Sequence, residues 1–233
     1  MEKLTANKSE KGTWDIPEIE KWEVTFTRLK EMILSGVNFK FARYGDGELN
    51  CMTGRQGANC DGHEYFPDLG ERLRNSFSDK VMTGVQPLMI TLSNADKFYE
   101  LIENKGLALY NADVLHNAMI DLQMSTLLEA IDKSGRDVVV IGPAHLRSFF
   151  FAPVSFVGIQ DLNCWLMYEE TKAELLKKLE GKTNAVILLC ASMMSEVLIH
   201  DLVDIPHAMI YCGSVFDPFV KIKSRKYHHK LVL

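Results

Sequence analysis

Short apolar runs alternate along the chain with longer segments in which apolar residues recur every three or four positions. The runs are rich in β-branched residues, which predicts buried strands, at residues 38–43, 107–110, 137–142, 155–160, 184–191 and 207–213. The periodic segments predict amphipathic helices at residues 19–36, 67–77, 95–106, 113–135, 168–181 and 192–204. Apolar strands separated by helices are typical of a parallel sheet covered on both faces. We therefore expect one Rossmann-like α/β domain over residues 1–233, with a mostly parallel sheet and helices on both faces.

Composition narrows the class of protein. The hydrophobic fraction of 47% and the charged fraction of 24% are those of an ordinary globular chain. No apolar run approaches the roughly 20 residues of a membrane span, and the polar N-terminus lacks the apolar core of a secretory signal. The five cysteines are scattered without a CxxC pair, which favours a reducing cytoplasm. A net charge of −5 argues against a protein coated for nucleic acid.

The two ends of the chain differ from its middle. Residues 1–37 predict a helical lead-in to the first strand, and residues 221–233 form a basic tail. Between Lys221 and Lys230 the tail carries five lysines or arginines and two histidines, a patch that would steer a polyanion such as nucleic acid. We favour a solvated terminus over that alternative.

Four polar stretches follow predicted strands, at the edge of the sheet where open parallel sheets bind ligands. They are RYGDGE, IGPAHLR, CASMMSE and CGSVFDPF. Because the carboxyl ends of parallel strands share one edge, we expect these stretches to lie near one another.

The first stretch places Asp46 and Glu48 two positions apart, with a glycine on either side of the aspartate. We expect a turn, because Asp-Gly sequences favour turns and a helix would point the two carboxylates to nearly opposite sides. In a turn the carboxylates can converge on Mg²⁺ or Mn²⁺, and Gly45 and Gly47 would let a phosphate approach the backbone. Arg43 would bind that phosphate or pair with a carboxylate, and an ordinary tight turn is the alternative to a site.

These residues carry a resemblance to a known family. FARYGDGELNCM resembles the signature of the GT-D-type glycosyltransferases, in which an Arg-aromatic-Gly-Asp-Gly-Glu run carries an Asp-x-Glu metal motif, and AVILLCASMMSEVLIHDLVDIPHAMIYCGSVFDPF resembles a later part of that family. The resemblance implies a Rossmann-like fold, a nucleotide-diphosphate sugar donor (a UDP sugar by default), and dependence on Mn²⁺ or Mg²⁺ through Asp46 and Glu48. The chain departs from the family at Ser214, where some members have histidine, and at CASMM, where a Gly-Pro turn is common.

Further donor-binding residues are expected at strand ends. Gly142 and Ser192 follow apolar strands and precede helices, whose free N–H groups suit phosphate. Ordinary helix capping is the alternative for Ser192. Gly213 and Ser214 follow the last predicted strand and complete the expected donor-binding set.

The acceptor hydroxyl needs a general base. Asp217 is the first candidate, because its loop follows the last strand; a turn aspartate before Pro218 is the alternative. A polar loop with Asn59, Asp61 and His63 is expected to contact the acceptor or the sugar.

The function expected from the sequence is metal-dependent transfer of a hexose or pentose to a hydroxyl acceptor on a glycan, a glycoprotein or a hydroxylated DNA base. The alternatives are a metal-dependent phosphohydrolase or nucleotidyl transferase, and a sugar-nucleotide-binding protein without catalysis. A dinucleotide oxidoreductase is disfavoured, because no GxGxxG follows a strand. The sequence leaves open whether the chain forms a homo-oligomer.

Overall fold

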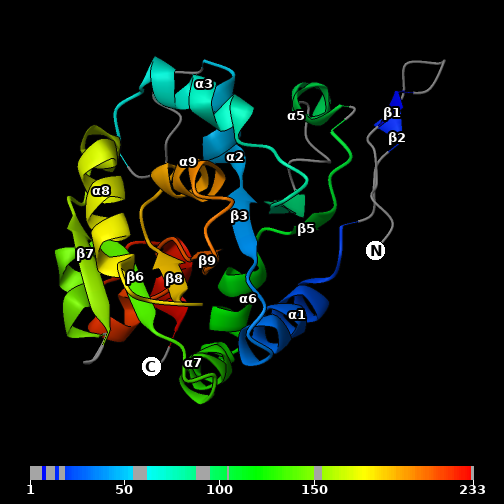
Figure 1. Ribbon diagram of the computed structural model, residues 1–233. Coiled ribbons are helices and arrows are strands. Elements are labelled where there is room, and N and C mark those ends of the chain that lie inside the picture. Colours follow the sequence, from blue (N-terminus) through cyan, green and yellow to red (C-terminus); the bar gives the residue numbers. More distant parts are fainter. Residues whose placement is uncertain are drawn as a thin grey trace.

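The computed structural model describes residues 7–8, 14–15, 19–54, 62–87, 95–103, 105–149 and 154–231. Among these residues, seven parallel strands form the central sheet in the order β5-β4-β3-β9-β8-β6-β7 (Figure 1). The strands are β3 (Lys40–Tyr44), β4 (Met82–Val85), β5 (Leu109–Asn111), β6 (Val138–Pro143), β7 (Ser155–Ile159), β8 (Val186–Leu189) and β9 (Ala208–Tyr211). Two short strands, β1 (Asn7–Lys8) and β2 (Trp14–Asp15), form a separate antiparallel pair.

The α-helices whose bounds are described cover both faces of the sheet (Figure 1). They are α1 (Trp22–Leu34), α2 (Asp46–Met52), α3 (Pro67–Asn75), α5 (Ala95–Ile102), α6 (Val114–Ile120), α7 (Met124–Lys133), α8 (Tyr168–Leu179) and α9 (Met194–Asp201). Helices α2, α3, α5, α8 and α9 pack in one apolar cluster, and α1, α6 and α7 in the other. The predicted α/β fold with a parallel sheet and helices on both faces is confirmed.

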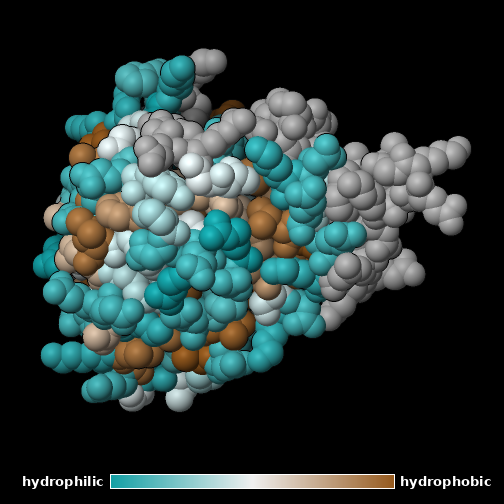
Figure 2. Space-filling view, turned by 90° about the horizontal axis from the view of Figure 1, so that it is seen from above, coloured by the Kyte–Doolittle hydropathy of each residue, from teal (hydrophilic) through white to brown (hydrophobic). Residues whose placement is uncertain are grey.

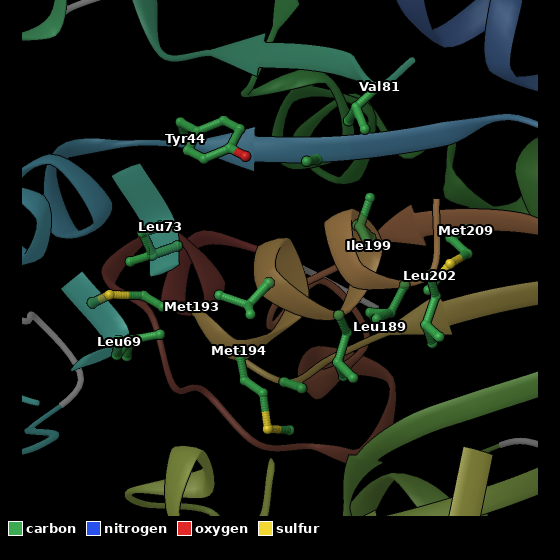
Figure 3. Packing of buried hydrophobic residues seen from close by; sticks show 14 of the residues in the cluster. Tyr44, Leu69, Leu73, Val81, Leu189, Met193, Met194, Ile199, Leu202 and Met209 are labelled. Carbon is green, nitrogen blue, oxygen red and sulfur yellow. The ribbon is translucent and has the colours of Figure 1, made fainter. Parts of the chain in front are cut away.

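Alternate residues of each strand enter opposite clusters. In β8, Ile187 and Leu189 pack with the α9 layer, while Val186 and Leu188 pack with the α1 layer. Both sides of the strand are buried, which explains why its sequence is apolar throughout. Figure 3 shows the first cluster, in which Met193 lies toward α3.

The structure differs from the predicted elements at two places. The sequence analysis did not predict β4, whose central Gly84 weakens the strand signal; a Cβ there would lie 2.9 Å from the Phe41 ring and 3.1 Å from the Ala42 carbonyl oxygen. The single helix predicted over residues 113–135 is two helices, α6 and α7, separated at Leu122, which has a left-handed φ of 56°. The break lets both short helices pack against α1.

The strand order reverses between β3 and β9. From β3 the chain proceeds through β4 to β5 at one edge, then crosses to β6 and β7 at the other edge and returns through β8 to β9. The chain leaves β3 toward β4, whereas the segment that follows β9, the last strand, packs against the turn that follows β6 on the other side. This divergence opens the crevice where doubly wound sheets bind ligands.

Seen from the side of α3, the surface formed by described residues is mostly hydrophilic with scattered apolar patches (Figure 2). Among the described residues, no helix combines the length and apolar character that crossing a membrane requires.

Candidate functional site

Two adjoining cavities occupy the crevice at the carboxyl ends of β3 and β9. We call the first the carboxylate cavity; its volume is about 180 Å³, and its polar lining includes Arg43, Asp46, Glu48, Asp113 and His116. We call the second the histidine cavity; its volume is about 410 Å³, and its polar lining includes His63, His145, Asp161, Asp217 and Ser224. The two cavities share a wall made of Ser192, Tyr211, Gly213, Ser214 and Arg225.

The predicted turn at the first polar stretch is wrong, because helix α2 begins at Asp46. Glu48 explains the helix start: its Oε2 accepts the Gly45 N–H at 2.6 Å and Arg43 Nη1 at 3.1 Å, so the side chain caps the first turn. Glu48 is buried and Asp46 is exposed. Both carboxylates nevertheless line the carboxylate cavity, since the first turn of α2 opens onto it.

Arg43 is held between two carboxylates. Besides Glu48, its Nη2 lies 3.9 Å from Asp113 Oδ1, and 23% of the side chain is exposed. A Cβ on Gly45 would lie 2.6 to 2.8 Å from the guanidinium, so glycine is required for this close approach. Burial alone would lower the pKa of Arg43, but the charges of Glu48, Tyr211 and Asp113 raise it above its usual value. Of the two roles left open for Arg43, the ion pair is formed.

The carboxylate cavity has oxygen atoms that could hold a cation. Within the described residues, Glu48 Oε1 and both Asp46 carboxylate oxygens accept no hydrogen bond. Such hard oxygens suit Mg²⁺ or Mn²⁺, which keep several waters and bind substrate phosphates. The described part of the chain contains no group of three or more metal-ligating side chains, so a cation here would take its remaining ligands from water and a bound phosphate. Asp46 and Glu48 therefore supply part of the ligand set that the expected cation requires.

The sequence analysis did not single out Glu196, which lies in the first turn of α9. It is fully buried, and neither carboxylate oxygen has a hydrogen-bond partner among the described residues. Burial and the nearby charge of Glu48 raise its pKa well above the usual range. No local sequence signal marks it, because its isolation depends on the packing of α9 against β3, β9 and α3.

Ser192 lies in the loop between β8 and α9 with a left-handed φ of 47°. Helix capping, the alternative left open for Ser192, is wrong: Met193 precedes the first helical residue, and Ser195 Oγ accepts the Ala191 N–H at 3.3 Å. Backbone strain of this kind in a non-glycine residue is concentrated at functional sites. Ser192 lines both cavities, which agrees with its expected place at the ligand edge.

The other expected donor-binding residues differ in position. Gly213 has a left-handed φ of 55° and lies against Tyr211, so that a Cβ would be 3.1 Å from that ring. Ser214 Oγ accepts Arg225 Nε at 3.2 Å. Gly142 lies within β6 and lines neither cavity; a Cβ on it would come within 3.2 Å of neighbouring side chains, which gives it a packing role.

Asp217 is buried and has both carboxylate oxygens engaged. Its Oδ1 lies 3.1 Å from His145 Nε2, and its Oδ2 accepts a short hydrogen bond from Ser224 Oγ. His145 belongs to the 3₁₀ turn η1 (Ala144–Ser148) that follows β6, and Asp217 begins η3 (Asp217–Val220) after β9. The sequence analysis singled out both stretches but did not name His145.

His63 connects two loops at the histidine cavity. Its Nδ1 accepts the Asn163 N–H at 2.9 Å, and Asn163 Oδ1 accepts the Glu64 N–H at 2.8 Å. The other two residues expected to contact the acceptor or the sugar, Asn59 and Asp61, lie outside the described residues.

The expectation of a solvated C-terminus is wrong for part of the tail. The Ile222 N–H donates to the Asp217 carbonyl oxygen at 3.0 Å, which turns the chain back over the sheet edge. Arg225 consequently lines both cavities, and His228 is fully buried. The tail thus supplies a cation to the crevice.

The fold is similar to that of solved structures of the domain of unknown function 1792. A new glycosyltransferase (DUF1792) from Streptococcus sanguinis has a TM-score of 0.65 and 15% identity, over 86% of this chain and 82% of that one. A selenomethionine-substituted structure of DUF1792 has a TM-score of 0.59 and 18% identity, over 84% and 83%. A third, a DUF1792 domain with a distinct glycosyltransferase fold, has a TM-score of 0.58 and 16% identity, over 84% and 83%. No protein-family model and no curated protein matches the chain. The chain therefore has the glycosyltransferase fold of the DUF1792 structures.

Proposed function

We propose that this protein is a glycosyltransferase that moves a sugar from a nucleotide-diphosphate donor, a UDP sugar by default, to a hydroxyl acceptor with the help of Mn²⁺ or Mg²⁺. One observation carries the proposal: in a chain with this fold, Asp46 and Glu48 line one cavity at the point where the strand order reverses. That crevice is where doubly wound sheets bind nucleotides.

The charges around the carboxylate cavity support a need for a cation. Asp46, Glu48 and Asp113 contribute three carboxylates, against the guanidiniums of Arg43 and Arg225. A diphosphate entering this excess of negative charge would be repelled unless a cation offset it. When bound by Asp46 and Glu48, the cation would supply Lewis-acid stabilisation to the leaving diphosphate.

The chain's own groups would bind and orient the donor. Arg225 stands at the wall between the cavities, where its guanidinium would pair with diphosphate oxygens. Gly213 has no side chain, so the donor can approach the backbone there. This arrangement would leave the histidine cavity for the acceptor, for which we propose a hydroxyl of a glycan or a glycoprotein.

Thermal stabilisation by a panel of nucleotide sugars, with and without Mn²⁺, tests the proposal on the wild type and the Asp46→Ala variant. A ligand at 100 times its dissociation constant stabilises the folded state by about 2.7 kcal/mol. We expect this shift for one nucleotide sugar, only with Mn²⁺ and only when Asp46 is present. Asp132→Ala, which removes an exposed carboxylate from α7, should shift like the wild type.

Product analysis distinguishes the proposal from related activities. Incubation with the stabilising donor and an acceptor mixture should yield free nucleoside diphosphate and a glycosylated product. Release of inorganic phosphate without sugar transfer would contradict the proposal and favour a phosphohydrolase. Tight donor binding without turnover on any acceptor would favour a binding protein.

A further inference from the structure

We infer that His145 is the base that takes the proton from the acceptor hydroxyl, and that Asp217 positions its imidazole ring. This inference rests on the proposed function. It assigns chemistry to the histidine cavity and gives Asp217, the base expected from the sequence, a positioning role.

The two residues have the geometry of an oriented base. His145 Nε2 lies 3.1 Å from Asp217 Oδ1, and their side chains are 25% and 8% exposed. The second carboxylate oxygen of Asp217 is engaged by Ser224, so the carboxylate is fixed from both sides. A carboxylate accepts the proton of a ring nitrogen, which puts the proton on Nε2 and leaves the lone pair on Nδ1. A base oriented in this way by a buried carboxylate is a recurring catalytic arrangement.

The remaining ring nitrogen faces an exposed carboxylate. His145 Nδ1 lies 3.5 Å from Asp161 Oδ1, and the Asp161 side chain is 72% exposed. Because Asp161 is well hydrated, it can yield its place at Nδ1 to an acceptor hydroxyl at little desolvation cost.

Charged and titratable groups around His145 come from its own turn and from four other segments. Asp217 faces it from η3 and Asp161 from the segment after β7. Arg225 from the tail and His63 from the loop before α3 line the same cavity. Arg147, on the same 3₁₀ turn, lies over the Phe156 ring at 5.1 Å. Among the described residues, Asp217 and Asp161 are the two carboxylates that lie within 4 Å of the ring nitrogens.

The shared wall of the cavities sets where the reaction would occur. With the donor in the carboxylate cavity and the acceptor in the histidine cavity, the sugar lies near Ser192, Tyr211 and Gly213, which line both. The acceptor oxygen forms a bond to the anomeric carbon while the bond from that carbon to the diphosphate oxygen breaks. The electron pair leaves with the diphosphate, and the acceptor proton passes to His145 Nδ1 and then to water.

The experiment compares His145→Gln and Asp217→Asn with the wild type in transfer rate and in donor affinity by calorimetry. A general base contributes about 10²- to 10⁴-fold to the rate, so His145→Gln should lower kcat by that factor and leave donor Kd within twofold. Asp217→Asn should lower kcat by at least about tenfold through the wrong tautomer. His200→Gln is the matched control: His200 also lies beside an aspartate, at 3.7 Å, but lines neither cavity, and the variant should transfer at the wild-type rate.

Two further measurements distinguish a role of Asp217 in orienting the His145 ring from a purely structural role. The fall in kcat toward acidic pH should disappear in His145→Gln, while Ser224→Ala should keep it. Long-range ¹⁵N correlation spectra should place the His145 proton on Nε2 in the wild type and shift it toward Nδ1 in Asp217→Asn. An unchanged tautomer would overturn the role of Asp217.

The outcomes distinguish this inference from the proposed function. If the wild type binds no nucleotide sugar, both fail. If it binds and transfers, but His145→Gln transfers at full rate, only the inference fails. If His145→Gln and His145→Asn both melt well below the wild type, His145 serves the fold, and the assignment as a base is overturned.

Discussion

Two acids on helix α9 have their pKa values shifted in opposite directions by their surroundings. Asp201, at the end of the helix, accepts hydrogen bonds from Arg72 and Tyr168 at 2.6 Å each and from Lys172 at 2.8 Å. Although burial by itself raises the pKa of Asp201, these donors lower it to about 2. Glu196, at the beginning of the same helix, has no partner among the described residues, and burial raises its pKa.

The difference follows the distance of each acid from the crevice. Asp201 joins α9 to α3 and α8 and lies away from the two cavities, where a satisfied ion cluster serves stability. Glu196 lies close enough to Arg43 and Glu48 for their charges to affect its titration. Acids with costly environments are concentrated at functional sites. Asp201, at the remote end of α9, therefore stabilises the fold, whereas the burial of Glu196, at the end near the crevice, costs stability.

Asp201→Asn is expected to have the largest effect on stability. The variant weakens three hydrogen bonds to charged or polar donors, and we expect its free energy of unfolding to fall by about 2 kcal/mol. This loss is smaller than three buried hydrogen bonds would give, because the side chain is partly exposed. Since the folded pKa of Asp201 is lowered from 3.8 to about 2, its contribution is present above pH 3.8 and is lost as the pH falls toward 2. Urea unfolding at several pH values measures both effects.

The matched control for this prediction is Asp204→Asn. Asp204 pairs with Lys80 at 2.7 Å on the surface, with its side chain 79% exposed, and such pairs contribute about 0 to 1 kcal/mol. Equal losses in the two variants would remove the distinction between the Asp201 cluster and an ordinary surface pair.

Glu196→Gln is expected to change the pH dependence of stability in the opposite sense. The folded pKa of Glu196 is raised above its ordinary value of 4.5, so its ionisation leaves the folded state unaffected below pH 4.5 and destabilises it as the pH rises above that value. This loss amounts to about 1.4 kcal/mol per pH unit until the folded pKa is reached. The glutamine variant should lack this slope, so its free energy of unfolding relative to the wild type should rise as the pH increases above 4.5.

Glu129→Gln serves as the control for Glu196, because Glu129 is an exposed partner of Lys133 on α7. Its free energy of unfolding should differ from that of the wild type by the same small amount at every pH above 5. Parallel curves for the wild type and Glu196→Gln would show that Glu196 is ionised in the folded state.

The smallest effects are expected at two residues with left-handed backbone, Ser192 and Leu122. A left-handed conformation costs roughly 1–2 kcal/mol in a residue with a Cβ, and glycine removes this cost. Glycine also loses more backbone entropy on folding, which offsets about 0.5–1 kcal/mol of the stabilisation. Leu122→Gly and Ser192→Gly should therefore each raise stability by up to about 1 kcal/mol. Calorimetry should show weaker donor binding in Ser192→Gly alone, because Leu122 lies at the break between α6 and α7. Weaker donor binding in both variants would contradict the distinction.

Much of the fold could be predicted, because its signals are local. The runs that became β6, β8 and β9 are apolar at every position, as strands buried on both faces must be. β4 was not predicted, because its Gly84 weakens the local strand signal. That glycine is needed for close packing against Phe41 of the neighbouring strand. The break at Leu122 was not predicted, because leucine itself favours a helix. The break depends on the packing of two short helices against α1.

The candidate site was predictable at its strand ends and unpredictable in its contacts. The order of apolar and polar segments by itself determined a parallel sheet, its ligand-binding edge and the place of Asp46, Glu48 and Asp217 at that edge. Only the tertiary structure decided that Glu48 caps a helix, that Arg225 from the tail enters the crevice, and that His145 meets Asp217 across 72 positions of sequence. The physical reason is that hydrophobic periodicity acts within one element, whereas hydrogen bonds and desolvation depend on which elements the fold brings together.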